Sequence, residues 1–400
     1  MKRVELLSPA GDLEKLRSAL HFGADAVYLA GKNFGLRSFA GNFTDEELLQ
    51  AIKEVHSLGK KVYVAVNIFA SNADFGHLAA YVDFLSSIRP DGLIVSDPGV
   101  IDFVRKRSDL DIHLSTQANT TNKYAAAFWR DCGVKRIVLA RETSLKDIAE
   151  TAEYLNGSAE LEVFIHGAMC ISYSGRCLIS TYLTDRDSNR GECVQACRWE
   201  YLLTEKSRKG SPLTLEEDER GSYVLNSKDL NTMPFVDKII EAGVASLKIE
   251  GRMKSPYYVG SVTNAYRKRI DDYYEGKPYD ASLNEELFKV NHREYTSGFF
   301  FGKAEQCLET SKPFNDYAFA AKVLSYDGVK KEVFVEMRNR FRKGDVLETV
   351  SVNGSYNLTV EKIVTERGES IEDCKIVQQK VYLPCPFPLQ ADDMLRIKLK

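Results

Sequence analysis

The stretch that organises this chain reads Leu161-Glu-Val-Phe-Ile-His166-Gly-Ala-Met-Cys170-Ile-Ser-Tyr-Ser-Gly-Arg-Cys177 and continues, after a polar loop, as Gly191-Glu-Cys193-Val-Gln-Ala-Cys197. It holds four of the eight cysteines of the chain. Residues 161–165 form an apolar run typical of a buried β-strand, which His166 and the following glycine end. The four thiols are therefore expected in loops beyond the end of a strand.

The strand at residues 161–165 belongs to a repeated pattern. From the N-terminus, a short apolar run, a loop and a helical segment follow one another. The predicted strands span residues 4–7, 25–29, 61–66, 92–95, 112–115, 136–140, 161–165 and 246–249. Strands that alternate with helices in this way over roughly 275 residues fit the size of a (β/α)8 barrel. A doubly wound open sheet is the alternative fold.

In a barrel of this kind, functional side chains gather at the C-terminal ends of the strands. Polar residues follow the predicted strands at these ends: Arg37, Asn67, Asp97, Gln117, Arg141, Glu142, His166, Lys248, Glu250 and Arg252. The cysteine segment leaves from the same face and can therefore cover the mouth of the barrel.

The pattern changes after the last predicted helix. Short alternating runs, separated by turns such as Asp327-Gly328 and Asn353-Gly354, predict a small antiparallel β-barrel. We therefore expect a barrel-like catalytic domain at 1–285, with a cysteine-bearing insertion at 168–235. A connector at 286–312 and a C-terminal β-barrel domain at 313–400 complete the expected organisation.

The composition excludes several classes of protein. The chain starts without an apolar segment of signal-peptide length, and no stretch approaches a membrane span, so we expect a cytoplasmic protein with no membrane contact.

In a reducing compartment, eight cysteines favour a metal site or catalysis over disulfides. The net charge of −3 gives no general signal for nucleic acid. Local basic groups at 248–269 and 338–343 are candidate RNA contacts, and ordinary solvated charge is the alternative.

The cysteine spacing differs from the paired C-x2-C motifs of a zinc ribbon. Six residues separate Cys170 from Cys177, fifteen separate Cys177 from Cys193, and three separate Cys193 from Cys197. Four thiolates can bind zinc or a 4Fe-4S cluster, and the spacing leaves both open, with four unrelated thiols as the third interpretation. His166 could activate Cys170 as a nucleophile, but a catalytic thiol does not explain three further cysteines.

The cationic residues at the strand ends suggest a small anionic ligand, because guanidinium groups match carboxylates in a bidentate way. The structural alternative is a ring of ion pairs in which Glu142 and Glu250 neutralise these cations.

Several motifs carry a specific resemblance. They are the run from Glu162 to Ser180, His113-Leu-Ser-Thr-Gln117-Ala-Asn119, Val138-Leu-Ala-Arg141-Glu142, Asn226-Ser-Lys-Asp-Leu230 and Leu247-Lys248-Ile-Glu250-Gly-Arg252-Met-Lys254. Together with the C-terminal β domain they cover most of the chain. The chain resembles the collagenase-like peptidase family, a peptidase family of unknown mechanism.

Within this family the chain is most similar to the branch of tRNA hydroxylation proteins. The resemblance implies hydroxylation at C5 of the wobble uridine of tRNA, with prephenate as the source of oxygen. It also implies a 4Fe-4S cluster on Cys170, Cys177, Cys193 and Cys197. Related branches hydroxylate a cytidine of ribosomal RNA or take part in ubiquinone hydroxylation.

The leading hypothesis is therefore an iron-sulfur tRNA hydroxylase. Its predicted catalytic residues are His166, Glu250 and Arg141. Its predicted substrate-binding residues are Arg37, Gln117, Lys248 and Arg252. The expected partners are tRNA, prephenate or a similar small dicarboxylate, and a paralogue or a second copy of the chain.

Two other functions remain open at this point. A peptidase acting on unfolded or collagen-like chains would use Cys170 as its nucleophile. A protein that binds RNA without catalysis would use zinc only to staple the insertion.

Overall fold

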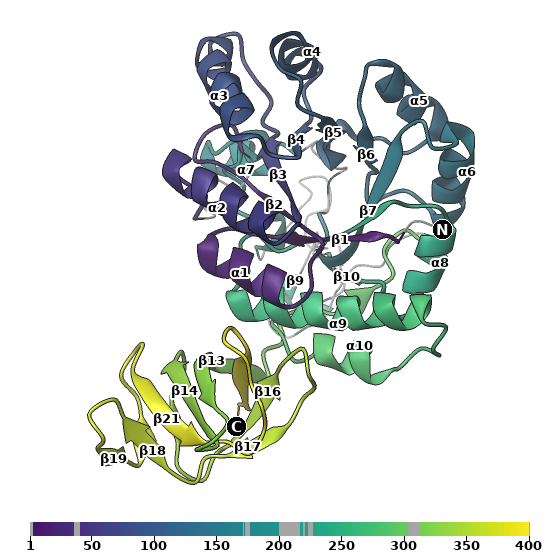
Figure 1. Cartoon of the computed structure of the whole chain (residues 1–400). Helices are drawn as coiled ribbons and strands as arrows, with labels where there is room; N and C mark the ends of the chain where they lie inside the picture. The colour runs from purple at the N-terminus through teal and green to yellow at the C-terminus, as the bar shows by residue number, and fades with distance from the viewer. Residues whose placement is uncertain are drawn as a thin grey trace, which may run out of the picture.

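A computed structural model of the chain describes residues 3–35, 41–170, 172, 177–199, 217–218, 221–222, 227–302, 304 and 313–399. Figure 1 shows a ring of strands surrounded by helices, with a smaller all-β domain packed below it. Among the described helices, none combines the length and the apolar character needed to cross a membrane.

In the described part of the chain, eight parallel strands close into a barrel. Their spatial order is their order in the sequence, and the last strand pairs with both the first and the seventh. These strands are β1 (Glu5–Pro9), β2 (Ala26–Leu29), β3 (Lys61–Val66), β4 (Gly92–Val95), β5 (Ile112–Leu114), β6 (Arg136–Val138), β7 (Glu160–Ala168) and β11 (Ser246–Ile249). The (β/α)8 prediction is confirmed, and the open sheet is wrong because the pairing of β11 with β7 leaves no open edge.

Helices cover the outside of the barrel (Figure 1). They are α1 (Leu13–His21), α2 (Asp45–Ser57), α3 (Asp74–Ile88), α4 (Pro98–Arg107), α5 (Lys123–Asp131), α6 (Leu145–Leu155), α8 (Val236–Glu241) and α9 (Pro256–Tyr274). Polar side chains start several of them: Asp12 caps α1, and Thr44 forms a capping box with Glu47 at α2. Asp97 accepts a hydrogen bond from the N–H of Val100 at 3.0 Å and caps α4. Asp97 therefore has a structural role at the strand end.

The inside of the barrel is filled by side chains. Its small apolar layer consists of Leu7, Ala26, Tyr28, Ala30, Tyr63, Ala65 and Ile94. Along β2, Ala26 and Tyr28 belong to this layer, whereas Val27 and Leu29 belong to the larger core between strands and helices. The barrel is therefore a packed support for the polar residues at its mouth, as its alternating strands require.

Two short strands extend the sheet beyond the barrel. β10 (Asp229–Asn231) pairs antiparallel with the end of β7, and β12 (Tyr295–Thr296) pairs parallel with β10. The helix α10 (Ser282–Leu287) lies beside α9. The sequence did not predict these strands, because two or three residues show no periodicity.

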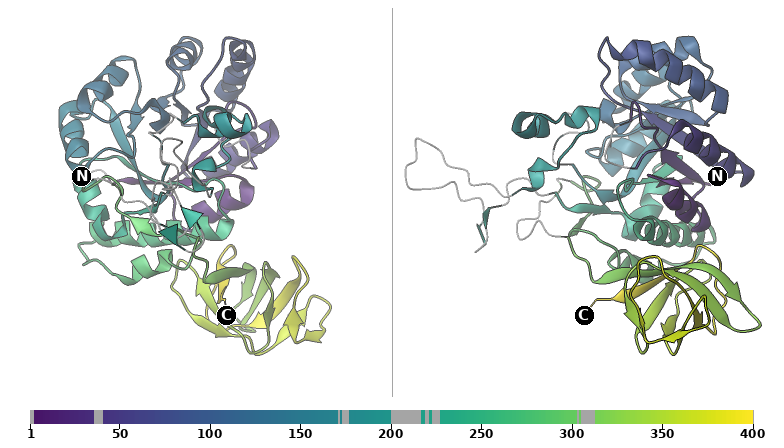
Figure 2. Two further views of the ribbon diagram at one scale, coloured as in Figure 1. Left: turned by 180° about the vertical axis from the view of Figure 1, so that it is seen from behind. Right: turned by 90° about the vertical axis from the view of Figure 1, so that its left-hand side faces the viewer.

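The cysteine segment leaves the barrel at the end of β7. Its described elements are α7 (Ile179–Thr184), the 3-10 turns η2 (Ser188–Arg190) and η3 (Ala196–Arg198), and the short strands β8 (Glu217–Asp218) and β9 (Gly221–Ser222). In the right-hand view of Figure 2, α7 stands away from the barrel. Arg190 ties the segment back to the barrel, because its Nη1 and Nη2 both bind the carboxylate of Asp74 at 3.0 Å.

The C-terminal residues form an antiparallel sheet that curves into half a barrel. The strands of this domain are β13 (Tyr317–Asp327), β14 (Glu332–Met337), β15 (Phe341–Arg342), β16 (Val346–Val350), β17 (Asn357–Thr359), β18 (Ile363–Thr365), β19 (Ser370–Ile371), β20 (Asp373–Cys374), β21 (Lys380–Pro384) and β22 (Met394–Lys398). The strand order in the sheet is β17-β16-β22-β13-β14-β21-β18-β19. The predicted small antiparallel domain is confirmed, and its limits at 285 and 313 stay predictions.

Aromatic and charged contacts join the two domains. Tyr257 of α9 stacks on Phe319 of β13, with ring centroids 5.8 Å apart and planes 11° from parallel. The fully buried Arg396 binds Glu286 of α10 at 2.8 Å and Glu348 of β16 at 2.7 Å. The β domain is therefore packed against the α9 and α10 side of the barrel.

Candidate functional site

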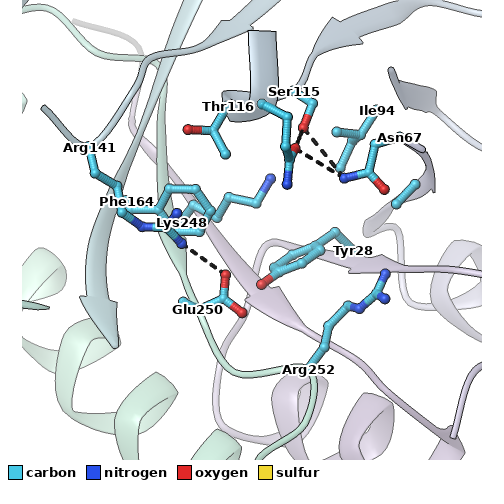
Figure 3. Close-up of a pocket in the computed structure, with 12 residues that line it drawn as sticks. Tyr28, Asn67, Ile94, Ser115, Thr116, Arg141, Phe164, Lys248, Glu250 and Arg252 are labelled. Carbon is cyan, nitrogen blue, oxygen red and sulfur yellow. Dashed lines mark hydrogen bonds and ion pairs between the residues drawn. The ribbon is translucent and has the colours of Figure 1, made fainter. Parts of the chain in front are cut away.

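A small cavity lies at the mouth of the barrel, where the strands end (Figure 3). Its volume is about 60 Å³, which is room for roughly four water molecules. Its lining residues are Tyr28, Ala65, Asn67, Ile94, Ser115, Thr116, Gln117, Arg141, Phe164, Lys248, Glu250 and Arg252. Of the predicted site residues, the structure brings together Gln117, Arg141, Lys248, Glu250 and Arg252.

Arg141 is oriented by an aromatic ring and a carboxylate. Its guanidinium carbon lies 3.8 Å from the centroid of the Phe164 ring, and its Nη2 donates to Oε2 of Glu250 at 3.0 Å (Figure 3). A guanidinium carries five N–H donors, and the bond to Glu250 uses one of them. The contact with the Phe164 ring limits the orientations that the guanidinium can adopt when it binds an anion.

Lys248 is held deeper in the barrel. Its Nζ binds Oε1 of Glu162 at 2.8 Å and lies 4.5 Å from the centroid of the Tyr28 ring. Glu162 also binds Arg136 at 3.3 Å. Burial alone would raise the pKa of Glu162, but the charges of Lys248 and Arg136 outweigh it and lower this pKa. Lys248 and Arg141 thus each have a carboxylate partner, as in the ion-pair alternative, although the partners are Glu162 and Glu250.

Amide and hydroxyl groups line the opposite wall. Nδ2 of Asn67 donates to Oε1 of Gln117 at 3.2 Å, and the hydroxyl of Ser115 donates to the same oxygen. A glutamine amide whose oxygen accepts these bonds has its NH2 group on the other side. Gln117 can therefore donate to a ligand oxygen, and its role in substrate binding stays a prediction.

The net charge of the cavity wall is positive. Arg141, Lys248 and Arg252 line it together with one carboxylate, Glu250. Arg252 is buried, with 4% of its surface exposed. Cations that are held in place and partly shielded from water bind carboxylate or phosphate groups more strongly than surface charges do.

Two glycines allow the backbone to pass close to this cavity. A Cβ at Gly167, whose φ is +103°, would lie 2.6 Å from the carbonyl oxygen of Glu250. A Cβ at Gly11 would lie 2.2 Å from the carbonyl oxygen of Arg252. Any larger residue at either position would displace the chain that carries Glu250 or Arg252.

His166 lies outside the cavity. In the pairing of β7 with β11, Phe164 is opposite Lys248, but His166 is opposite Ile249 because the register shifts by one residue. This β-bulge turns the side chain of His166 to the outer face, whereas strict alternation would direct it inward with Phe164.

On the outer face, the His166 ring is 1% exposed. The rings of Tyr258, Tyr266 and Tyr295 surround it, with centroids 5.5 to 5.9 Å away. Burial lowers the pKa of His166 to about 3, so the imidazole is neutral at pH 7. The structure does not bring His166 together with Arg141 and Glu250, and its geometry gives no support to the predicted catalytic role.

The four cysteines of the segment have no disulfide among the described residues. Cys170 follows the last residue of β7, Ala168, by two positions, so the segment starts at the end of this barrel strand. Cys170 is exposed and the other three are half-buried. Within the described residues, no three His, Cys, Asp or Glu side chains are grouped to hold a metal ion. Four thiols fit a thiolate-bound centre by their chemistry, and their assignment as ligands stays a prediction.

The predicted basic groups are largely engaged in ion pairs. In the β domain, Arg338 binds Glu14 at 2.6 Å, and Lys343 binds Glu372 at 3.1 Å. Arg269 of α9 binds Asp237 at 3.2 Å. The interpretation of these groups as paired structural charge therefore fits better than an open basic surface. Arg37, predicted to bind substrate, lies outside the described residues.

Sequence reasoning missed the aromatic walls of the site. Tyr28 alternates with Ala26 and Ala30 along one strand, and this period of two already indicates an inward position. Phe164 carries no such signal, because seven consecutive residues of its strand are buried and the apolar residues among them point to both faces.

Two models of one protein family match this chain over most of its length. The family model "Peptidase family U32" matches residues 11–310, and "Peptidase family U32 C-terminal domain" matches residues 315–396. The "tRNA hydroxylation protein P1" of Bacillus subtilis is 40% identical over 403 residues, which cover 99% of this chain and 95% of that protein. The "tRNA hydroxylation protein P" of Escherichia coli is 37% identical over 447 residues, covering 100% and 97% of the two chains.

A third relative carries a different name. The "Collagenase" of Porphyromonas gingivalis is 32% identical over 341 residues, which cover 82% of this chain and 80% of that protein. The resemblance in the sequence motifs is thus confirmed over both domains. From its N-terminal barrel to its C-terminal sheet, this chain belongs to peptidase family U32.

Proposed function

We propose that this protein hydroxylates RNA, and that its substrate is C5 of the wobble uridine of tRNA. Relatives that match almost its full length are named tRNA hydroxylation proteins. The structural observation that carries the proposal is the cavity lined by Arg141, Lys248 and Arg252, at the end of the barrel from which the cysteine segment leaves. A hydroxylase of this kind needs an anion site and a redox centre close together. The cationic cavity supports the anion site, and the cysteine segment supports the redox centre.

The anion site would bind prephenate, or a similar small dicarboxylate, as the source of the hydroxyl group. One carboxylate would bind the guanidinium of Arg141, which lies against the Phe164 ring. Gln117 would donate its amide N–H to a ligand oxygen. The cavity of about 60 Å³ suits one carboxylate-bearing end of a ligand, so the rest of the ligand and the base would lie above it.

The cysteine segment would hold a 4Fe-4S cluster through Cys170, Cys177, Cys193 and Cys197. When bound, such a cluster supplies electron-transfer chemistry that amino-acid side chains do not provide. Glu250, whose Oε2 accepts a bond from Arg141 at 3.0 Å, would accept a proton at its carboxylate. The target uridine would leave its stack to reach this site, because an atom inside a stacked base is not accessible.

The proposal is tested by nucleoside analysis. Protein purified without oxygen is incubated with tRNA that lacks the modification and with prephenate, and the tRNA is digested for mass spectrometry. We expect 5-hydroxyuridine with the wild type and none with Cys170→Ala or Cys193→Ala. Cys132→Ala is the matched control, because this half-buried cysteine lies outside the segment and should leave activity unchanged.

Metal analysis separates the alternatives. Four iron and four sulfide per chain, lost in the Cys170→Ala protein, are expected for a 4Fe-4S cluster. A colourless protein that contains one zinc and retains RNA would contradict the proposal and identify a zinc-stapled RNA-binding protein.

The relative named "Collagenase" favours a peptidase as the second candidate function. The geometry around Cys170 speaks against it, because the His166 ring is buried among tyrosines on the outer face of β7. A peptidase would lose activity only in the Cys170 variant and would be inactivated by a thiol reagent in the absence of metal. Cleavage of denatured collagen under these conditions would favour this second function.

A further inference from the structure

A second and larger cavity lies next to the barrel mouth. Its volume is about 530 Å³, and its walls come from the loop after β2, from α2 and α3, and from Arg190 of the cysteine segment. Asn67 lines the mouth cavity, and the next residue, Ile68, lines the second one. The two cavities therefore flank the same turn after β3.

Three aromatic rings form one wall of this second cavity. The centroids of Phe34 and Tyr81 are 5.5 Å apart with planes at 32°, and those of Tyr81 and Phe84 are 6.3 Å apart with planes at 28°. Phe34 and Phe84 are half-buried, and Tyr81 is buried. The wall therefore presents the surfaces of two partly exposed rings on a fixed support.

The backbone at Phe34 is unusual. Its φ is +59°, in the left-handed region that bulky side chains rarely adopt. Such conformations persist only where the surrounding structure holds them, and they cluster at ligand sites. The fold thus holds an aromatic side chain at the cavity in a conformation that a glycine would adopt more easily.

Polar and charged groups surround the aromatic wall, and their positive and negative charges balance. Lys32 and His77 are exposed at its edge, and Asp45 and Asp74 also line the cavity. Arg190 is bound to Asp74 and to the carbonyl oxygen of Phe69 at 3.0 Å. Flat apolar surfaces with mixed donors and acceptors around them suit a planar ligand with polar edges.

We propose that this cavity binds an unstacked base of the RNA, from a nucleotide next to the one that is modified. The inference rests on the proposed function, because it takes the barrel mouth as the site of the target base. When that base leaves its stack, its neighbour in the strand also loses a stacking partner and lies close to the turn after β3. Stacking on Phe34 and Phe84 replaces the lost contact and accepts any base, because every base has a flat face.

The test measures the binding of an anticodon stem-loop RNA with uridine at the wobble position. Three RNAs are compared: the intact stem-loop, and two forms that lack the base on the 5′ or the 3′ neighbour of this uridine. Wild-type protein is expected to bind one of the two abasic RNAs about tenfold more weakly than the intact stem-loop, because one stacked base is lost.

The protein variants are Phe34→Ala and Phe84→Ala. Each is expected to weaken binding of the intact RNA about tenfold and to leave binding of that abasic RNA unchanged. Phe84→Tyr keeps a ring and should bind as the wild type does. Phe128→Ala is the matched control, because Phe128 is 59% exposed on α5, away from both cavities, and should change nothing.

The remaining outcomes overturn the inference in different ways. If wild-type protein hydroxylates and binds all three RNAs equally, the second cavity holds no base while the proposed function stands. If the variants bind intact and abasic RNA more weakly by the same factor, the two rings stabilise the fold and do not stack on a base. Competition by uridine monophosphate as strong as that by the stem-loop would identify a mononucleotide site instead. Wild-type protein that neither binds nor modifies the stem-loop would overturn both proposals.

Discussion

The ammonium of Lys248 and the carboxylate of Glu162 form a 2.8 Å ion pair inside the barrel, with 4% and 1% of their side chains exposed. Glu162 also binds Arg136 from the neighbouring strand at 3.3 Å. One carboxylate thus serves two cations on different strands. It neutralises Lys248 at the wall of the mouth cavity, whereas Arg136 also binds Glu5 and Glu160 at 2.6 Å.

Replacing Glu162 by Gln should lower the free energy of unfolding by about 3–5 kcal/mol, because removal of one partner leaves uncompensated charge in the barrel. Urea unfolding followed by circular dichroism measures this change. Asp102→Asn is the control, because Asp102 forms an exposed pair with Lys106 on α4 and should be nearly neutral. Equal losses of unfolding free energy in the two variants would show that the buried pair stabilises the protein no more than the exposed pair does.

If prephenate is the source of the hydroxyl group, as proposed, Arg141→Lys should raise its KM about 10- to 100-fold, because lysine lacks the planar fork that binds a carboxylate. The measurement is the rate of 5-hydroxyuridine formation as a function of prephenate concentration. Arg130→Lys serves as the control, since Arg130 pairs with Asp131 on the outside of the barrel. An unchanged KM in Arg141→Lys would exclude Arg141 from the anion site.

Gly11→Ala should destabilise the protein by about 1–3 kcal/mol and reduce activity, because the new methyl group would meet the carbonyl oxygen of Arg252 at 2.2 Å. Gly76→Ala provides the opposite case: it lies in α3, and a Cβ there would meet nothing within 4 Å. Alanine is the better helix former, so this change should stabilise by roughly 0.4–1 kcal/mol. Thermal unfolding of both variants checks the pair, and a stable, active Gly11→Ala would refute the close approach.

The contact between the domains should weaken in acid. Burial alone would raise the pKa of Glu348, but hydrogen bonds from Arg396 and Lys289 outweigh it and lower the pKa to about 2. A lowered pKa in the folded state means that the stabilisation is complete above about pH 4.5 and is lost as the pH falls toward 2. For this single group it amounts to at most about 3 kcal/mol.

The comparison of wild type with Glu348→Gln isolates this contribution from those of other carboxylates. The difference in the free energy of unfolding should be largest at pH 6 to 7 and should shrink steadily below pH 4.5. A difference that stays constant between pH 7 and pH 3 would show that ionisation of Glu348 does not stabilise the structure.

Much of the fold could be predicted because its signals are local. The runs at 61–66, 92–95 and 246–249 agree with β3, β4 and β11 residue for residue. Their apolar composition, followed by residues that can cap a helix, is visible within a few positions of the chain. The position of the polar residues at the barrel mouth followed from the fold class, and Gln117, Arg141, Lys248, Glu250 and Arg252 do meet there.

The barrel, the β domain, the family and the charged residues around the mouth could therefore be inferred from the sequence alone. Which of the predicted residues share a cavity depends on the tertiary structure. A one-residue bulge in β7 puts His166 among tyrosines instead of beside Arg141, and the partner of Lys248 proved to be Glu162, 86 positions away. Register shifts and contacts between distant segments depend on how the whole barrel closes, so no local pattern of residues can specify them.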